Sequence, residues 1–73
     1  MKISPDRPKL FVNREVIDSS HKLNLELVEF QVGIVTAWGY RVFNGEQSII
    51  SDDLYTTRGE CVSDGYEVLK ANE

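Results

Sequence analysis

The residue types that nucleophilic catalysis requires lie next to one another in one polar stretch, Asp18-Ser19-Ser20-His21. Such catalysis needs a nucleophile, a base that accepts its proton and a third group that orients the base. Here the hydroxyls, the imidazole and the carboxylate follow one another in a loop, so no rigid element fixes their geometry. We therefore expect an exposed His21 and no reaction at this loop.

Cys61 is the only thiol in the chain. It lies near the start of a predicted helix, where the helix dipole lowers the pKa of a thiol. It also lies on the apolar stripe of that helix, and free cysteine is among the most buried residue types. We expect Cys61 to be a core residue.

Carboxylates gather between a predicted strand and this helix, at Asp52, Asp53 and Glu60. Oxygen ligands of this kind hold divalent cations, but the ligand spacing of an EF-hand loop is absent. Phosphate-loop, dinucleotide-binding and zinc-protease motifs are absent too. Acidic residues at such a place more often stabilise a helix N-terminus. We expect no metal, no cofactor and no enzymatic activity.

The stretch AWGYRVFNG, residues 37–45, carries the candidate binding residues Trp38, Tyr40, Arg41 and Phe43. Aromatic side chains with basic neighbours on a strand form the stacking platforms of proteins that bind single-stranded RNA. When this stretch is compared with the sequence pattern of RNA-recognition domains, however, only the pair Gly39-Tyr40 matches. Alternatively the face of Trp38 and Tyr40 is core, because a domain this small needs the apolar area of these rings. We favour the core interpretation.

Two prolines, Pro5 and Pro8, disfavour regular pairing at the start of the chain. We predict a flexible N-terminal arm over residues 1–8 and a single small α+β domain over residues 9–73. The apolar residues of KLFVNREVID, residues 9–18, are typical of a strand. The N-terminus lacks the apolar core of a signal peptide, and no stretch is apolar enough to span a membrane. Together with the lone thiol, this favours a cytoplasmic protein.

Residues 23–35 fit either a strand or a helix. Leu23, Leu25 and Leu27 alternate with polar residues, and from Val28 onward the apolar residues fall on even positions. Such a one-residue slip indicates a β-bulge within a strand. A helical stripe with Ser20 as the N-cap is the alternative. The β-branched residues toward the end of the segment favour the strand.

Asn44-Gly45 lies between two alternating runs and predicts a β-hairpin. A two-residue type I′ turn pairs Phe43 with Glu46. A type I turn with a bulge at Gly45 instead places Trp38 opposite Ile50. The pattern does not decide between the two registers.

After Thr57 the apolar residues recur with the spacing of a helix. Thr57 and Glu60 have the spacing of a capping box, and the apolar positions form the stripe of an amphipathic helix: Cys61, Val62, Gly65, Val68 and Leu69. Gly65 lets this helix approach the sheet closely. The predicted fold is α+β, an antiparallel sheet of three to four strands with one C-terminal amphipathic helix packed on one face.

The expected function is non-catalytic binding of another protein, with self-association through a sheet edge or face as one form of it. A domain of 73 residues buries only about 60% of its unfolded surface, and its edge strands must be covered, charged or paired. The alternative is a nucleic-acid-binding module that uses the basic arm and the aromatic strand 38–43. Residues 1–22 carry five basic and three acidic groups, but the whole chain has a net charge of −4, which makes nucleic acid the less favoured partner.

Overall fold

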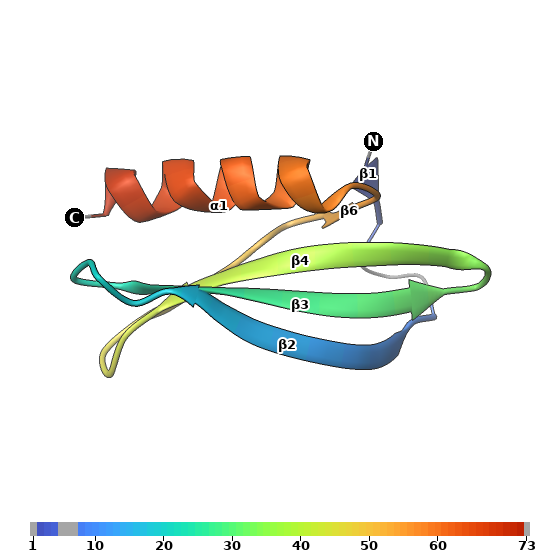
Figure 1. The fold of residues 1–73 in the computed structure, drawn as a ribbon, viewed down its shortest axis with the longest axis horizontal. Helices are drawn as coiled ribbons and strands as arrows, with labels where there is room; N and C mark the ends of the chain where they lie inside the picture. Colours follow the sequence, from blue (N-terminus) through green and yellow to red (C-terminus); the bar gives the residue numbers. More distant parts are fainter. Residues whose placement is uncertain (1, 5–7, 73) are drawn as a thin grey trace.

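The computed structural model describes residues 2–4 and 8–72 of the chain. The elements are β1 (Lys2–Ile3), β2 (Leu10–Asp18), β3 (Asn24–Val32), β4 (Val35–Phe43), β5 (Ser48–Ile50), β6 (Leu54–Tyr55) and α1 (Arg58–Ala71). The strands form one antiparallel sheet in the order β1-β6-β4-β3-β2, and β5 also pairs with β4. In Figure 1, α1 runs alongside the long strands above β4, and β2 forms the bottom edge of the sheet.

This architecture confirms the predicted α+β class with one C-terminal helix on one face of an antiparallel sheet. Three strands of nine residues build the sheet. Three further strands have two or three residues: β5 and β6 pair with β4, and β1 pairs with β6. These short strands raise the strand number above the expected three to four, because runs of two or three residues leave no period to detect in a sequence.

The first strand lies inside the region predicted to be a flexible arm. Lys2 pairs with Tyr55 and Ile3 with Leu54, which places β1 at the edge of the sheet. Ile3 also packs against a small apolar cluster. The described beginning of the chain is therefore attached to the domain, while residues 1 and 5–7 of the expected arm lie outside the described residues.

The predicted stripe of α1 packs on the sheet as expected. Cys61, Gly65 and Leu69 are buried, and Leu69 joins Leu23, Leu25 and Val42 in a cluster of fully buried side chains. Gly65 is the point of closest approach, because a Cβ atom there would lie 2.8 Å from Leu25 Cδ1. The close-approach role predicted for this glycine is confirmed.

Strand β3 is continuous, and the bulge predicted within residues 23–35 is absent from it. Its pairing with β4 runs without interruption from Asn24 opposite Phe43 to Val32 opposite Val35. Leu25 and Leu27 lie under α1, whereas Val32 and Phe30 belong to a second cluster with Ala37 and Leu54 on the other face. The apolar residues shift from odd to even positions along β3 because the first part of the strand packs under α1 and its last part packs on the opposite face.

Two bulges lie instead in β2. The register against β3 shifts between Phe11 and Asn13 and again between Val16 and Asp18. The extra residue at position 12 turns Phe11 to the same face as Arg14, because a bulge adds one residue to a period of two. Phe11, Arg14 and Val16 therefore all lie on the face opposite α1.

The hairpin predicted at Asn44-Gly45 is present, but both predicted registers are wrong. Phe43 pairs with Ser48 and Arg41 with Ile50, so the loop has four residues. Asn44 Oδ1 accepts the N–H groups of Glu46 (2.8 Å) and Gln47 (2.9 Å). This side-chain turn needs no left-handed residue at Gly45. The positive φ, +62°, occurs at Gly33 in the tight turn between β3 and β4.

At the N-terminus of α1, the Thr57 bond of the predicted capping box is not formed. The Thr57 hydroxyl donates to Glu60 Oε1 at 2.9 Å and does not accept a backbone N–H of the first turn. The helix still begins where the motif predicts.

Candidate binding face

The four predicted binding residues divide between the two faces of the sheet. Trp38 and Tyr40 lie on the α1 side and pack against the buried cluster of Leu27, Tyr55 and Cys61. Arg41 and Phe43 point to the opposite side, since successive residues of a strand alternate between faces. Trp38 and Tyr40 thus pack in the layer between sheet and helix, as the core interpretation expects, and Tyr40 also lines the groove described below. Arg41 and Phe43 are the candidate binding residues on the opposite face.

The side of the sheet opposite α1, here called the open face, exposes apolar side chains. Phe11 and Val16 of β2 are about half exposed, and Ile50 of β5 is 68% exposed. Val28 and Phe30 of β3 lie beside them, opposite Arg14 and Phe11 in the register of the sheet. The open face consists of Phe11, Arg14, Val16, Glu26, Val28, Phe30, Arg41, Phe43 and Ile50.

All three phenylalanines of the chain lie on this face, and each has a cation over its ring. Lys9 Nζ lies 5.1 Å from the centre of Phe30, Arg14 Cζ lies 5.8 Å from that of Phe11, and Arg41 Cζ lies 4.2 Å from that of Phe43. The rings of Phe11 and Phe30 also meet edge to face at 6.4 Å. Cations are attracted to the negative faces of aromatic rings, so positive charge and aromatic surface coincide here.

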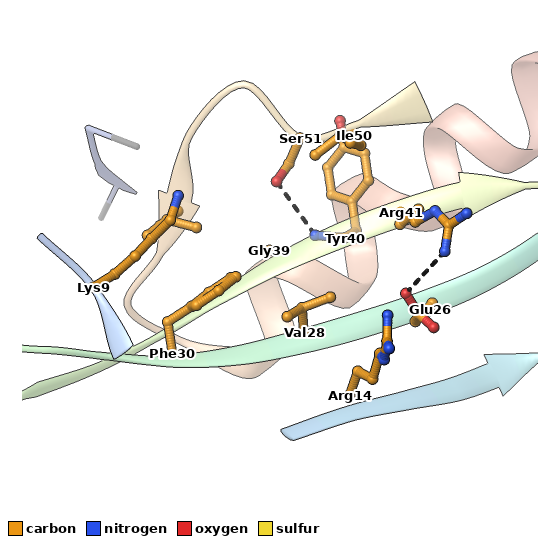
Figure 2. A pocket seen from close by; sticks show the side chains of 11 residues that line it. Lys9, Arg14, Glu26, Val28, Phe30, Gly39, Tyr40, Arg41, Ile50 and Ser51 are labelled. Carbon is orange, nitrogen blue, oxygen red and sulfur yellow. Dashed lines mark hydrogen bonds and ion pairs between the residues drawn. The ribbon is translucent and has the colours of Figure 1, made fainter. Parts of the chain in front are cut away.

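A groove of about 250 Å³ lies in the middle of the open face. Figure 2 shows Val28 and Gly39 between its two ends, with Lys9 and Phe30 at one end and the arginines at the other. A Cβ atom on Gly39 would lie 3.1 Å from Ser51 Oγ, so the absence of a side chain there keeps this part of the groove open.

Among the described residues, one acidic side chain lines the groove. Glu26 is 7% exposed, and its Oε1 lies 3.6 Å from Arg41 Nη1. Arg41 Nε also donates to Ser48 Oγ at 3.1 Å, which ties the guanidinium to β5. Arg14 rises from β2 to the same end of the groove (Figure 2) and has no ion pair with any residue that the structure describes.

The Asp18–His21 loop is organised around its carboxylate. Asp18 accepts from the Ser20 N–H (2.9 Å), the Ser20 hydroxyl (2.8 Å) and the Tyr66 hydroxyl (2.8 Å). These hydrogen bonds, those from Ser20 first, lower the pKa of Asp18 below its usual value. The Ser20 proton is thus directed at Asp18, while His21 Nε2 lies 3.7 Å from the same carboxylate. The arrangement anchors the loop to α1.

Cys61 is fully buried, as predicted. Burial, reinforced by the charge of Asp64, raises the pKa of the thiol to about 12 despite the opposing charge of Arg58. A thiol that stays protonated is a poor nucleophile and a poor metal ligand. Cys61 therefore serves packing.

Acidic and metal-ligating side chains do not converge on a site in the described part of the chain. Among those residues, no three His, Cys, Asp or Glu side chains come together where a metal ion could be held. None of the helical structure within residues 2–4 and 8–72 has the length and apolar character of a membrane span.

Most residues of the groove were missed in the sequence. Lys9, Arg14 and Phe30 meet there through pairing between β2 and β3. The bulge at position 12 brings Phe11 to the same face as Arg14, beside the groove. A bulge of this kind has no signature in a strand that is exposed on both sides. Comparison with known proteins finds no matching family model, no matching curated protein and no matching solved structure.

Proposed function

We propose that the protein is a non-catalytic binding module that docks another protein on the open face of its sheet. The observation that carries the proposal is the asymmetry of the two faces. One face is covered by α1, while the other exposes Phe11, Val16 and Ile50 around a groove. Exposed apolar residues gathered around a hollow are typical of interaction sites. The single buried cysteine suits a reducing compartment such as the cytoplasm.

The edge of β2 is a poorer docking site than the face. Between its two bulges, β2 pairs regularly over Asn13–Val16. A two-fold antiparallel pairing centred in this run sets Arg14 opposite its own copy or Glu15 opposite its own copy, and like charges directly opposite destabilise a sheet. Bulges and charges of this kind protect edge strands from pairing.

A second copy of the chain is also a poorer partner than a different protein. In the part of the chain that the structure describes, the groove is lined by three basic residues, Lys9, Arg14 and Arg41, and by one acidic residue, Glu26. Two open faces packed together would bring six cations and two carboxylates into one interface. The excess of positive over negative side chains in such an interface opposes association.

Single-stranded nucleic acid is the second candidate, and the three cation–phenylalanine pairs favour it. Bases stack on aromatic rings and on guanidinium planes beside basic groups. Against it stands the net charge of −4, because non-specific phosphate binding requires a strongly basic surface.

Site-specific photocrosslinking in cells that naturally produce the protein tests the proposal. The photoreactive residue p-benzoylphenylalanine replaces Ile50 on the open face in one variant and Glu67 on the outer side of α1 in the other. Both positions are exposed. We expect a discrete protein adduct from position 50 alone, and nuclease treatment should leave it unchanged. The same adducts from both positions, a nuclease-sensitive adduct, or an adduct of the chain with itself would overturn the proposal.

A further inference from the structure

We infer that the docked partner presents an extended acidic segment to the groove, in which one large apolar side chain is flanked by carboxylates. The inference rests on the proposed function and adds the chemistry of the partner. It follows from the size of the groove, from the nature of its middle and from the charges at its two ends.

The size of the groove suits one side chain. Its volume of about 250 Å³ lies below the roughly 300–1,000 Å³ of sites for drug-sized ligands. Val28, Phe30 and Leu54 supply apolar lining, and Gly39 supplies depth. Protein interfaces are dominated by a few large side chains that fill such pockets. The middle of the groove is therefore an anchor site for an aromatic or large aliphatic residue.

The ends of the groove select negative charge. At one end Arg14 and Arg41 flank Glu26 (Figure 2), and this carboxylate pairs with Arg41 at 3.6 Å. Arg14 makes no ion pair inside the described ranges, so its guanidinium can receive a partner's carboxylate in the bidentate geometry that arginine favours. At the other end the Lys9 ammonium lies over Phe30. A chain with carboxylates on both sides of its anchor meets positive charge at each end.

The charges also indicate which segments are rejected. A basic segment would place its cations beside Arg14 and Lys9, and like charges in an interface disfavour the wrong partner. An oligonucleotide would satisfy the cations, but it carries a phosphate at every nucleotide and would bring more negative charge to a protein with a net charge of −4 than a segment with two carboxylates does. An acidic segment with an apolar anchor places its apolar side chain on the apolar middle of the groove and its carboxylates beside the cations at the two ends.

The test uses synthetic decapeptides of glycine and serine that carry one central triplet. Glu-Trp-Glu is the proposed chemistry, Lys-Trp-Lys reverses its charge, and Glu-Ser-Glu removes its anchor. Hexathymidylate serves as the nucleic-acid probe. Binding is followed by NMR through the backbone amide shifts of Val28, Gly39 and Ile50 in isotope-labelled protein. Arg14→Gln removes the guanidinium from the groove, and Arg58→Gln is the control, because Arg58 pairs with Glu15 on the α1 side.

We expect Glu-Trp-Glu to shift these amides saturably and to bind at least about tenfold more tightly than either altered triplet, since anchor and charges act together. Arg14→Gln should weaken its binding by about two- to fivefold, the range of an exposed ion pair, and Arg58→Gln should leave it unchanged. Equal binding of Lys-Trp-Lys, tighter binding of hexathymidylate, or no saturable shift with any probe would overturn the inference. If position 50 crosslinks a protein while the peptides show no charge preference, the inference fails and the proposed function stands.

Discussion

Gly65 of α1 lies directly against Leu25 of β3, so close that a Cβ atom on the glycine would be 2.8 Å from Leu25 Cδ1 and 3.3 Å from Tyr40 Cβ. Leu25 is fully buried, and the side chains around it leave it little room to move. This contact sets the distance between helix and sheet. It closes one face of the sheet and leaves the other face uncovered by the helix.

Gly65→Ala is expected to destabilise the protein although alanine is the better helix former. Overpacking of a buried contact costs about 1–3 kcal/mol, which outweighs the gain in helix propensity of about 1 kcal/mol. A net loss of about 1 kcal/mol lowers the melting temperature of a domain of this size by roughly 4–8 °C, as measured by circular dichroism. Gly59→Ala is the matched control, since no atom lies within 4 Å of a Cβ atom there. An equal or higher melting temperature for Gly65→Ala would contradict the close packing.

Trp38→Ala should lower the free energy of unfolding by about 3 kcal/mol, the lower end of the range for large aromatic residues, because Trp38 packs against the Leu27–Tyr55–Cys61 cluster but is only half-buried. Ile50→Ala on the open face should change it by no more than about 0.5 kcal/mol. Urea unfolding of the two variants measures the difference. A Trp38→Ala variant as stable as the wild type would return Trp38 to the list of binding residues.

The turn between β3 and β4 requires a glycine at position 33, whereas the loop between β4 and β5 does not require one at position 45. Gly33 has a φ of +62°, and no other described residue has a positive φ. Gly33→Ala should therefore cost about 1–2 kcal/mol through backbone strain alone, since open space surrounds this position. Gly45→Ala, also in open space, should be close to neutral. Urea midpoints of the two variants decide between this arrangement and a type I′ turn at Asn44-Gly45, which would make Gly45 the sensitive position.

Stability should fall as the solution becomes alkaline. Burial raises the pKa of Cys61 from 9.0 to about 12, and burial together with the hydrogen bond to Asp64 raises the pKa of Tyr55. In the unfolded chain these groups lose their protons at lower pH than in the folded protein. Their contribution is complete below the unfolded pKa and is lost as the pH rises toward the folded pKa.

Urea midpoints measured between about pH 8 and about pH 11 should therefore decrease steadily, with the thiol contributing from about pH 9. Cys61→Ala should flatten the first part of the decrease, whatever its effect on the absolute stability. The same pH dependence in the variant and the wild type would show that the thiol is not buried in solution.

Local patterns in the sequence were sufficient for the elements that have one covered face. The stripe from Cys61 to Leu69 predicted α1 and its contact with the sheet. In β3 the same logic failed, because Leu25 and Leu27 face α1 while Phe30 and Val32 pack on the other side. The sequence of one strand does not show that its first part packs against a helix on one face while its last part packs against other residues on the opposite face.

The open face could not be predicted because it depends on contacts between strands. Arg41 and Phe43 were identified from their place on one strand. The pairs of Lys9 with Phe30 and of Arg14 with Phe11 arise only when β2 is registered on β3 with its bulge. Residues 9–18 expose nearly every side chain, so they carry no periodic signal for that register.

The central claim, that the open face binds an acidic partner through Arg14, is tested most directly by charge reversal combined with crosslinking. Arg14→Glu is introduced into the protein that carries p-benzoylphenylalanine at position 50, and Arg58→Glu serves as the control on the α1 side. Both arginines are exposed, so the free energy of unfolding, measured with urea, should stay within about 0.5 kcal/mol of that of the parent protein. We predict that Arg14→Glu reduces the yield of the protein adduct at least about tenfold through charge repulsion, whereas Arg58→Glu leaves it unchanged. An undiminished adduct with Arg14→Glu in a folded protein would contradict the account.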